Sequence, residues 1–125
     1  LSTKYYYLAI QKSVVSGIFN EGTYTGNSSS GRDITGVGFN PSVIIVKSNS
    51  SAVSRIKSLE ITDSSSSLGN GNESPNTIQQ LIADGFRVSS SSTVNGNGPQ
   101  YYWLAFRENE PINNHVNTRS KLIRM

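Results

Sequence analysis

The sequence predicts an all-β protein, a jelly-roll-like β-sandwich of about eight strands with one short helix. Ser, Asn and Gly fill 46 of the 125 positions, and these residues favour turns over helices. Only 34% of the residues are hydrophobic and 15% are charged, which is low for a globular domain on both counts. Short β-rich runs alternate with turn clusters, as in a sandwich rather than in βαβ units. A chain of this length is expected to form one core.

The first predicted strands flank a polar loop at residues 26–31. Residues 14–19 and 22–24 precede this loop and are rich in β-branched and aromatic side chains. Residues 33–39 follow it and contain Gly36 and Gly38, which are typical of a bulge or a close backbone approach. We therefore expect strands on both sides of the loop.

The apolar run at residues 43–46, Val-Ile-Ile-Val, is predicted to be the most buried strand, covered on both faces. Residues 52–61 are predicted to form a further strand with weak alternation. Residues 64–73 contain Leu68 as their only apolar side chain, so this segment is expected to be an exposed, mobile loop. Deletion of residues 65–71 should therefore cost little stability.

A short helix is predicted between the two halves of the sandwich. Ser74 can cap its N-terminus, Pro75 suits its first position, and Gly85 ends it. The apolar residues between them have helical spacing and would share one face: Ile78, Leu81 and Ile82.

Three further segments complete the predicted sandwich. Residues 86–88 begin the return, the Asn-Gly-Asn-Gly sequence at residues 95–98 tolerates positive φ in a hairpin, and residues 101–106 form the closing strand. No element is predicted beyond Pro111. The predicted core consists of Phe19, Val37, Phe39, Val43, Ile45, Ile56, Leu59, Ile78, Leu81, Phe86, Val88, Trp103 and Ala105.

A strand sequence is repeated near the two ends of the chain. Tyr-Tyr-Tyr-Leu-Ala-Ile at residues 5–10 recurs 96 residues later as Tyr-Tyr-Trp-Leu-Ala-Phe at residues 101–106, and a period of domain length indicates a module. Residues 1–12 are interpreted as the last strand of a preceding module, residues 13–110 as one sandwich module, and residues 111–125 as a basic tail. Alternatively, two neighbouring strands converged independently on aromatic residues.

The first copy of this repeated strand, residues 5–10, has no module of its own to complete. Unpaired backbone groups and bulky apolar side chains are costly in water. We therefore expect the segment to add to an open sheet edge, either in this domain or in a neighbouring copy, with exchange between copies slightly favoured.

The net charge of +3 arises in the tail rather than in the body of the chain. Residues 1–110 carry equal numbers of basic and acidic side chains, so the strong basic field that nucleic-acid binding needs is missing. No apolar run is long enough to span a membrane. Neither nucleic acid nor membrane is an expected partner. The tail could dock on an acidic surface or could simply be solvated, and its basic residues are Arg119, Lys121 and Arg124.

Side chains suited to catalysis are mostly missing from the sequence. There is no cysteine, and the only histidine, His115, lies in the tail, so a catalytic triad is not expected. No zinc-binding or phosphate-binding motif occurs. A calcium site is an alternative, but the spacing of its oxygen ligands does not match a calcium loop. We therefore expect no enzymatic activity, metal or cofactor. The calcium candidates are Asp63, Asn70, Asn72 and Glu73.

The aromatic strands are the best candidates for assembly or recognition. Strand alternation puts Tyr101 and Trp103 on one face and Tyr102 on the other. The first copy of the strand alternates in the same way, and packing in a core or an interface is favoured over stacking on sugar rings. The candidate residues are Tyr5, Tyr6, Tyr7, Tyr101, Tyr102 and Trp103.

Five stretches carry a family resemblance: residues 22–27, 34–47, 84–88, 94–95 and 101–106. Together they resemble a β-rich module of unknown function that occurs, sometimes repeated, in tail and virion proteins of tailed bacteriophages. The resemblance covers most of the chain and leaves out the tail. It implies a structural virion component, for example a capsid decoration, cement, tail or fibre protein, and it brings no catalytic residues.

On this interpretation the protein lies on the virion surface and acts through protein–protein assembly. Its partners would be copies of itself and other capsid or tail proteins. A homo-oligomer is expected, with a trimer favoured, because the aromatic residues cannot all fit one small core. The alternative function is an extracellular or fibre-borne glycan-binding module that uses Tyr and Trp stacking.

Overall fold

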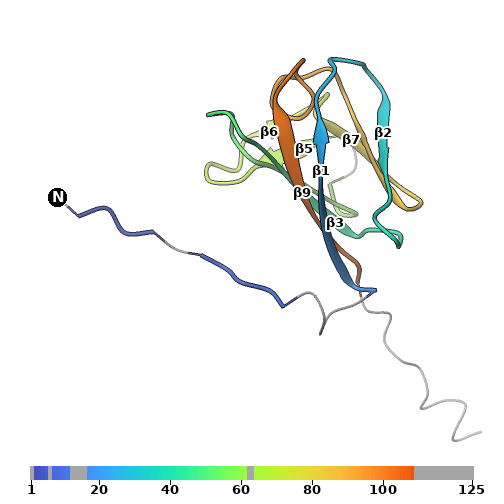
Figure 1. Cartoon of the computed structure of the whole chain (residues 1–125), viewed down its shortest axis with the longest axis horizontal. Coiled ribbons are helices and arrows are strands. Elements are labelled where there is room, and N and C mark those ends of the chain that lie inside the picture. The colour runs from blue at the N-terminus through green and yellow to red at the C-terminus, as the bar shows by residue number, and fades with distance from the viewer. Residues whose placement is uncertain (1, 6, 12–16, 62–63, 109–125) are drawn as a thin grey trace, which may run out of the picture.

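The computed structural model describes residues 2–5, 7–11, 17–61 and 64–108, which form two antiparallel sheets and no helix (Figure 1). The strands are β1 Phe19–Thr25, β2 Arg32–Thr35, β3 Val43–Ser48, β4 Arg55–Ser58, β5 Ser65–Ser67, β6 Glu73–Ser74, β7 Ile78–Ile82, β8 Gly85–Val88 and β9 Gln100–Phe106. One sheet has the order β1-β9-β3-β4-β5-β6 and the other β2-β8-β7. The predicted all-β sandwich is confirmed, and its jelly-roll connectivity stays a prediction.

The core lies between the two sheets and is dominated by aromatic rings. Tyr24 and Tyr101 stack with their ring centroids 5.1 Å apart. Phe86 meets Tyr24 and Trp103 edge to face, at 6.2 Å in both cases. Aliphatic side chains from both sheets surround these rings. The buried apolar cluster is Tyr24, Ile34, Val37, Phe39, Ile44, Val46, Ile78, Phe86, Val88, Val94, Tyr101, Trp103 and Ala105.

Strand β3 buries the opposite residues from those predicted. Ile44 and Val46 are buried, whereas Val43 and Ile45 are partly exposed. Four consecutive apolar residues give no contrast between the two faces, so alternation cannot choose between them. The pairing with β9 decides, because Ile44 lies opposite the buried Ala105.

Strand β4 is shorter than the strand predicted at residues 52–61, and the buried position of this strand is occupied by a lysine. Lys57 is only 3% exposed, and its ammonium group donates hydrogen bonds to the carbonyl oxygens of Ile61 at 2.7 Å and Ser64 at 2.8 Å. These oxygens replace the water that a buried cation loses. The core assignments of Ile56 and Leu59 are wrong, because Ile56 is partly exposed and Leu59 is 58% exposed.

The predicted helix does not form, and its apolar residues lie in β7. Ile78 pairs with Val88 and Leu81 with Phe86, with a register shift between Ile78 and Gln80. This bulge adds one residue to the strand, so Ile78 and Leu81 both reach the core although they are three positions apart. A spacing of three is also helical, which explains why the pattern indicated a helix.

The serine-rich segment at residues 64–73 is not the exposed loop that its polarity predicts. It contributes β5 and β6, which pair with each other, and β5 also pairs with β4. Ser65 is fully buried, and its hydroxyl hydrogen-bonds to that of Thr77. Backbone pairing satisfies main-chain groups of this segment and Thr77 satisfies the Ser65 hydroxyl, and hydropathy registers neither contact. Deletion of residues 65–71 would remove a strand, so it is expected to destabilise the domain.

The segment at residues 89–99 crosses from β8 in one sheet to β9 in the other and is not the predicted hairpin. Asn95 is fully buried within it. The Asn95 side-chain oxygen accepts a hydrogen bond from the Asn27 N–H at 3.1 Å, and its amide group donates to the Ser29 carbonyl at 2.8 Å. This buried amide therefore ties the crossing segment to the loop between β1 and β2.

Gly36 and Gly38 lie in the loop after β2, where the predicted close backbone approach is not found, because a Cβ at either position would meet no atom within 4 Å. Both have positive φ, 92° and 88°. Their N–H groups donate to the Asp84 carboxylate at 3.2 and 2.5 Å. Asp84 stands in the turn between β7 and β8, so one carboxylate connects this turn to the loop that leads into β3.

Gly26 marks the place where the end of β1 approaches the crossing segment most closely. Its N–H donates to the Pro99 carbonyl at 2.8 Å, and its carbonyl accepts from the Gly98 N–H at 3.1 Å. A Cβ at Gly26 would overlap the Gly96 carbonyl oxygen and lie 2.7 Å from a ring carbon of Tyr101. Any side chain here must displace the backbone of the crossing segment.

We expect Gly26→Ala to lower the free energy of unfolding by about 3 kcal/mol, because the new methyl group overlaps fixed backbone. Urea denaturation followed by circular dichroism measures this loss. Thr25→Ala changes the neighbouring, exposed side chain and serves as the control, with an expected loss below about 1 kcal/mol. Equal losses in the two variants would contradict the close approach.

Candidate assembly surface

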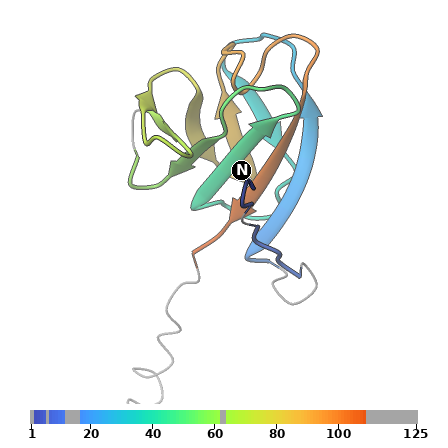
Figure 2. The ribbon, with the colours of Figure 1, turned by 90° about the vertical axis from the view of Figure 1, so that its left-hand side faces the viewer.

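The six-stranded sheet has an outward face that carries a row of aliphatic side chains. Figure 2 looks onto this face, with β1 in blue at one side and β9 in orange next to it. Strand register puts Leu104 of β9 beside Ile45 of β3, and Ile45 beside Ile56 of β4. Leu104 is 37% exposed, and the other two are partly exposed. The outward face of an antiparallel sheet is usually polar, so this row is a candidate contact surface.

The apolar surface continues along β9 in both directions from this row. Tyr102 is 47% exposed and lies beside Lys47 of β3, while Phe106 lies beside Val43. The Phe106 ring also packs against Phe19, with their centroids 5.2 Å apart. We call the whole surface the outer patch, and it consists of Val43, Ile45, Ile56, Tyr102, Leu104 and Phe106.

A groove extends the outer patch at the end of the sandwich where β9 finishes. Val43 and Phe106 line it together with Leu59, and its volume is about 290 Å³. A second groove of about 520 Å³ shares Leu59 and is lined by Arg107 and Glu108 as well. The exposed Leu59 thus continues the patch into a concave region with charged walls.

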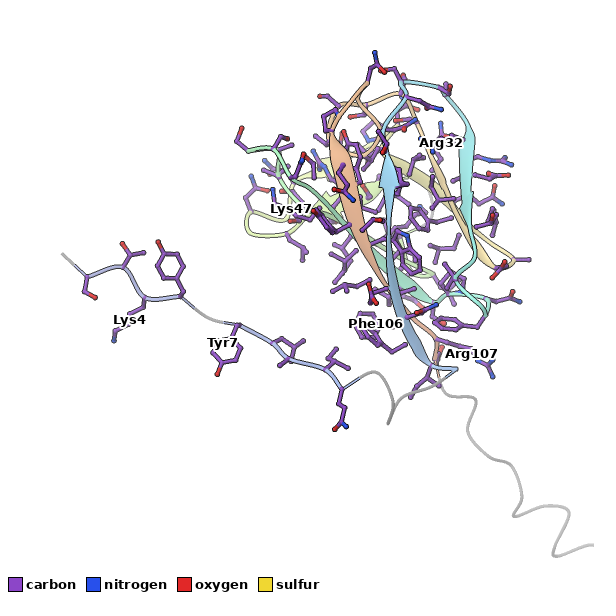
Figure 3. All side chains as sticks on the ribbon, in the orientation of Figure 1. Lys4, Tyr7, Arg32, Lys47, Phe106 and Arg107 are labelled. Atoms are coloured by element: carbon purple, nitrogen blue, oxygen red, sulfur yellow. The ribbon has the colours of Figure 1, made fainter. Side chains whose placement is uncertain are left out.

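Charged side chains border the outer patch and do not enter its centre. The Lys47 ammonium group, visible on this side of the domain in Figure 3, donates to the carbonyls of Ser50 at 3.0 Å and Ala52 at 2.5 Å. Glu21 of β1 lies beside Leu104 at the opposite border. The centre can therefore lose its water without burying a charge.

Two of the predicted assembly residues, Tyr101 and Trp103, belong to the core. They are 0% and 5% exposed. The Tyr101 hydroxyl donates to the Ser92 carbonyl and accepts from the Gly96 N–H, both at 2.7 Å. These aromatic side chains hold the sandwich together and present no face to a sugar ring. Of the three predicted residues of β9, Tyr102 is the one on the surface.

Residues 2–5 and 7–11 form no strand and pair with no sheet edge of this domain (Figure 1). Tyr5 is 86%, Tyr7 93% and Leu8 82% exposed, and Figure 3 shows Tyr7 away from the sandwich. Tyr6 lies outside the described residues. Pairing within one chain is therefore not found, and pairing with a neighbouring copy stays a prediction.

Several predicted residues lie outside the described part of the chain: His115, Arg119, Lys121, Arg124 and Asp63. Two remaining calcium candidates have local hydrogen bonds, since Asn70 accepts from the Asn72 N–H at 3.2 Å and Glu73 accepts from the Ser64 hydroxyl at 3.3 Å. Within the described ranges, no three His, Cys, Asp or Glu side chains gather as metal ligands. Nor does any helix there have the length and apolar character to cross a membrane.

The strands and the outer patch lie in a part of the chain that matches a known sequence family. Residues 13–111 match the family described as a domain of unknown function, DUF7483. The chain belongs to this family. The DUF7483 region includes the outer patch and the nine strands found in the described residues, and residues 5–10 precede it. No curated protein and no solved structure matches the chain.

Asn95 and Tyr24 are two important residues of the DUF7483 region that the sequence did not single out. Asn95 resembles the many surface asparagines of this chain, and no periodic pattern distinguishes it. The Tyr24 hydroxyl donates to the Val94 carbonyl, and the Arg32 guanidinium lies 5.3 Å from the centre of the Tyr24 ring. The available signal for Tyr24 was that it lies, like Tyr101, in a predicted strand with an aromatic side chain that could pack against another strand.

The ionisation of Tyr24 gives a pH-dependent test of the core. Burial raises the pKa of its hydroxyl above the ordinary value near 10, Tyr101 raises the pKa further, and Arg32 lowers it. The folded state therefore keeps this proton at pH values where the unfolded state loses it. The contribution of Tyr24 to stability is complete below about pH 10 and declines as the pH rises further.

We expect Tyr24→Phe to make the free energy of unfolding less sensitive to pH above about pH 10. At pH 7 the variant should be about 1 kcal/mol less stable, because the hydrogen bond to Val94 is lost. Urea denaturation at pH 7, 9 and 11 measures both effects. The same alkaline decline in both proteins would argue against a buried, neutral Tyr24.

Proposed function

We propose that this DUF7483 domain is a structural component of a tailed-bacteriophage virion, and that it binds neighbouring proteins through the outer patch. The observation that carries the assembly role is the aliphatic row of Leu104, Ile45 and Ile56 on the outward face of the six-stranded sheet. The bacteriophage setting comes from the sequence resemblance to tail and virion modules. A capsid decoration, cement, tail or fibre protein would use such a surface.

The composition of the outer patch supports a protein partner. Interface centres are depleted in charge and enriched in aromatic side chains, and the patch has Tyr102 and Phe106 beside its aliphatic row. Burial of partly exposed apolar side chains contributes roughly 25 cal/mol per Å². Because the charges stand at the border, a partner could cover the centre without a desolvation penalty for ions.

We further propose that another copy of the chain is the first partner, in a homo-oligomer with a trimer favoured, and that other capsid or tail proteins follow. The uncharged centre of the patch creates no like-charge repulsion between identical surfaces. Such a component would sit on the particle surface. We propose no enzymatic activity, cofactor, nucleic-acid partner or membrane partner for it.

Glycan binding is the second hypothesis, and the burial of Tyr101 and Trp103 weakens its original basis. Tyr102 is the exposed aromatic side chain of β9 that could still stack on a sugar ring. A glycan array with the purified chain tests this hypothesis, and binding that Tyr102→Ala abolishes would favour it.

We expect Leu104→Glu to reduce self-association at least about tenfold, because a buried, unpaired carboxylate is costly at an interface. Sedimentation velocity over a range of concentrations measures the change, and circular dichroism checks that the variant is folded. Thr35→Glu adds the same charge at an exposed position of β2 and should leave association unchanged. A monomer at every concentration of the unmodified chain would count against the homo-oligomer.

The virion assignment has its own test. An antibody raised against this chain is expected to label intact bacteriophage particles at a fixed position in negative-stain images. Labelling at the capsid would indicate a decoration role, and labelling at the tail would indicate a tail or fibre role. Absence of the chain from purified particles, measured by mass spectrometry, would contradict the proposal.

A further inference from the structure

Strand β9 occupies the slot between β1 and β3, where it pairs with a neighbour on both sides. Its three core-facing residues, Tyr101, Trp103 and Ala105, are 0%, 5% and 0% exposed. Without β9, strand β1 would lose its partner and the aromatic core would lose two of its rings. The slot therefore accepts a strand of one particular pattern: large, large and small side chains toward the core, with apolar side chains outward.

Residues 5–10 have this same pattern. In the alignment of the two copies, Tyr5 corresponds to Tyr101, Tyr7 to Trp103, and Ala9 to Ala105. At the outward positions, Leu8 corresponds to Leu104 and Ile10 to Phe106. The third outward position is Tyr in both copies, at residues 6 and 102. The two sequences differ at two positions: the first copy has Tyr7 where β9 has Trp103, and Ile10 where β9 has Phe106.

The same side chains have opposite surroundings in the two copies. Tyr101 is fully buried, whereas Tyr5 is 86% and Tyr7 93% exposed. Within this chain the slot is already filled by β9, so residues 5–10 have no place in their own sandwich. Exposed aromatic and aliphatic side chains such as those of Tyr5, Tyr7 and Leu8 gain free energy when they are buried.

We propose, as a deepening of the assembly role proposed above, that residues 5–10 act as a β9-type strand that completes a second copy of the DUF7483 domain whose β9 slot is vacant. Tyr5 would then lie opposite the second copy's equivalents of Tyr24 and Ser48, and Ala9 opposite its equivalents of Asn20 and Ile44, as their counterparts do in β9. Backbone pairing on both sides would supply the affinity, and the three inward side chains would supply the specificity.

The position of the chain ends within the sandwich allows this arrangement. The end of β9 lies beside the start of β1, where the Arg107 N–H donates to the Ile18 carbonyl at 2.8 Å. Eight residues, 11–18, separate the β9-type strand from β1, and they can span up to about 26–29 Å when extended.

The first test places a vacant slot next to the segment in the full chain. A copy of residues 13–96 is joined directly before Leu1, so that residues 5–10 follow the added β1–β8 unit at the natural spacing. We expect the backbone amides of residues 5–10 to become protected from hydrogen exchange by about 100-fold or more. We also expect the added unit to unfold cooperatively. An unprotected segment would overturn the proposal.

A matched pair of variants in this tandem protein separates specific insertion from unspecific collapse. Tyr7→Glu puts a charge at a core-facing position and should abolish the protection. Leu8→Glu puts the same charge one residue later, at the position equivalent to the partly exposed Leu104, and should retain the protection. Protection that survives Tyr7→Glu would overturn the proposal, since an unpaired carboxylate among the aromatic rings of the core is costly.

The second test uses the original chain and does not depend on the added unit. Trp103→Tyr combined with Phe106→Ile gives β9 the sequence of residues 5–10. We expect a cooperative thermal transition, with the melting temperature lower by roughly 10–20 °C because Tyr at position 103 fills the core less completely and Ile at position 106 loses the ring contact with Phe19. Loss of the cooperative transition would overturn the proposal. The first test leaves the outer patch of the original domain unchanged, so Leu104→Glu and the exchange protection of residues 5–10 can fail independently of each other.

Discussion

The two-sided pairing of β9 is the constraint on which the rest of the structure depends. By joining β1 to β3 it makes one sheet out of two parts, and its alternation divides the aromatic strand between two tasks. Tyr101 and Trp103 complete the core, while Tyr102 and Leu104 form part of the outer patch. The register with β9 also selects which residues of β3 are buried. The core and the candidate assembly surface are therefore two faces of one strand.

Two polar side chains stabilise the loops between strands, which the pairing of β9 does not fix. Asp84 accepts hydrogen bonds from the N–H groups of Gly36 and Gly38, and Asn95 joins the crossing segment to the loop after β1. Neither side chain could be replaced by an apolar one without leaving backbone groups unpaired. The abundance of Ser, Asn and Gly in this chain thus reflects loops stabilised by specific hydrogen bonds as well as simple solvent exposure.

Sequence patterns predicted the all-β class and the closing strand, because composition and turn chemistry are local properties. Sequence patterns failed where contacts with residues distant in the sequence determine the structure of a segment. The bulge in β7 imitates helical spacing, and the serines of β5 are buried through backbone pairing that hydropathy does not measure. The outer patch escaped prediction because its residues come from three strands, and only their register brings Leu104, Ile45 and Ile56 together.

The antiparallel contact between Ile18 and Arg107 brings the chain into and out of the sandwich at the same end. A mechanical load applied through these two points would pull β1 and β9 apart from that end. Their hydrogen bonds run across the strands, so the load would break them one after another instead of shearing them all at once. A domain with this geometry resists tension poorly when it forms a link in a chain. Attachment through one end alone would put no load across its sheets.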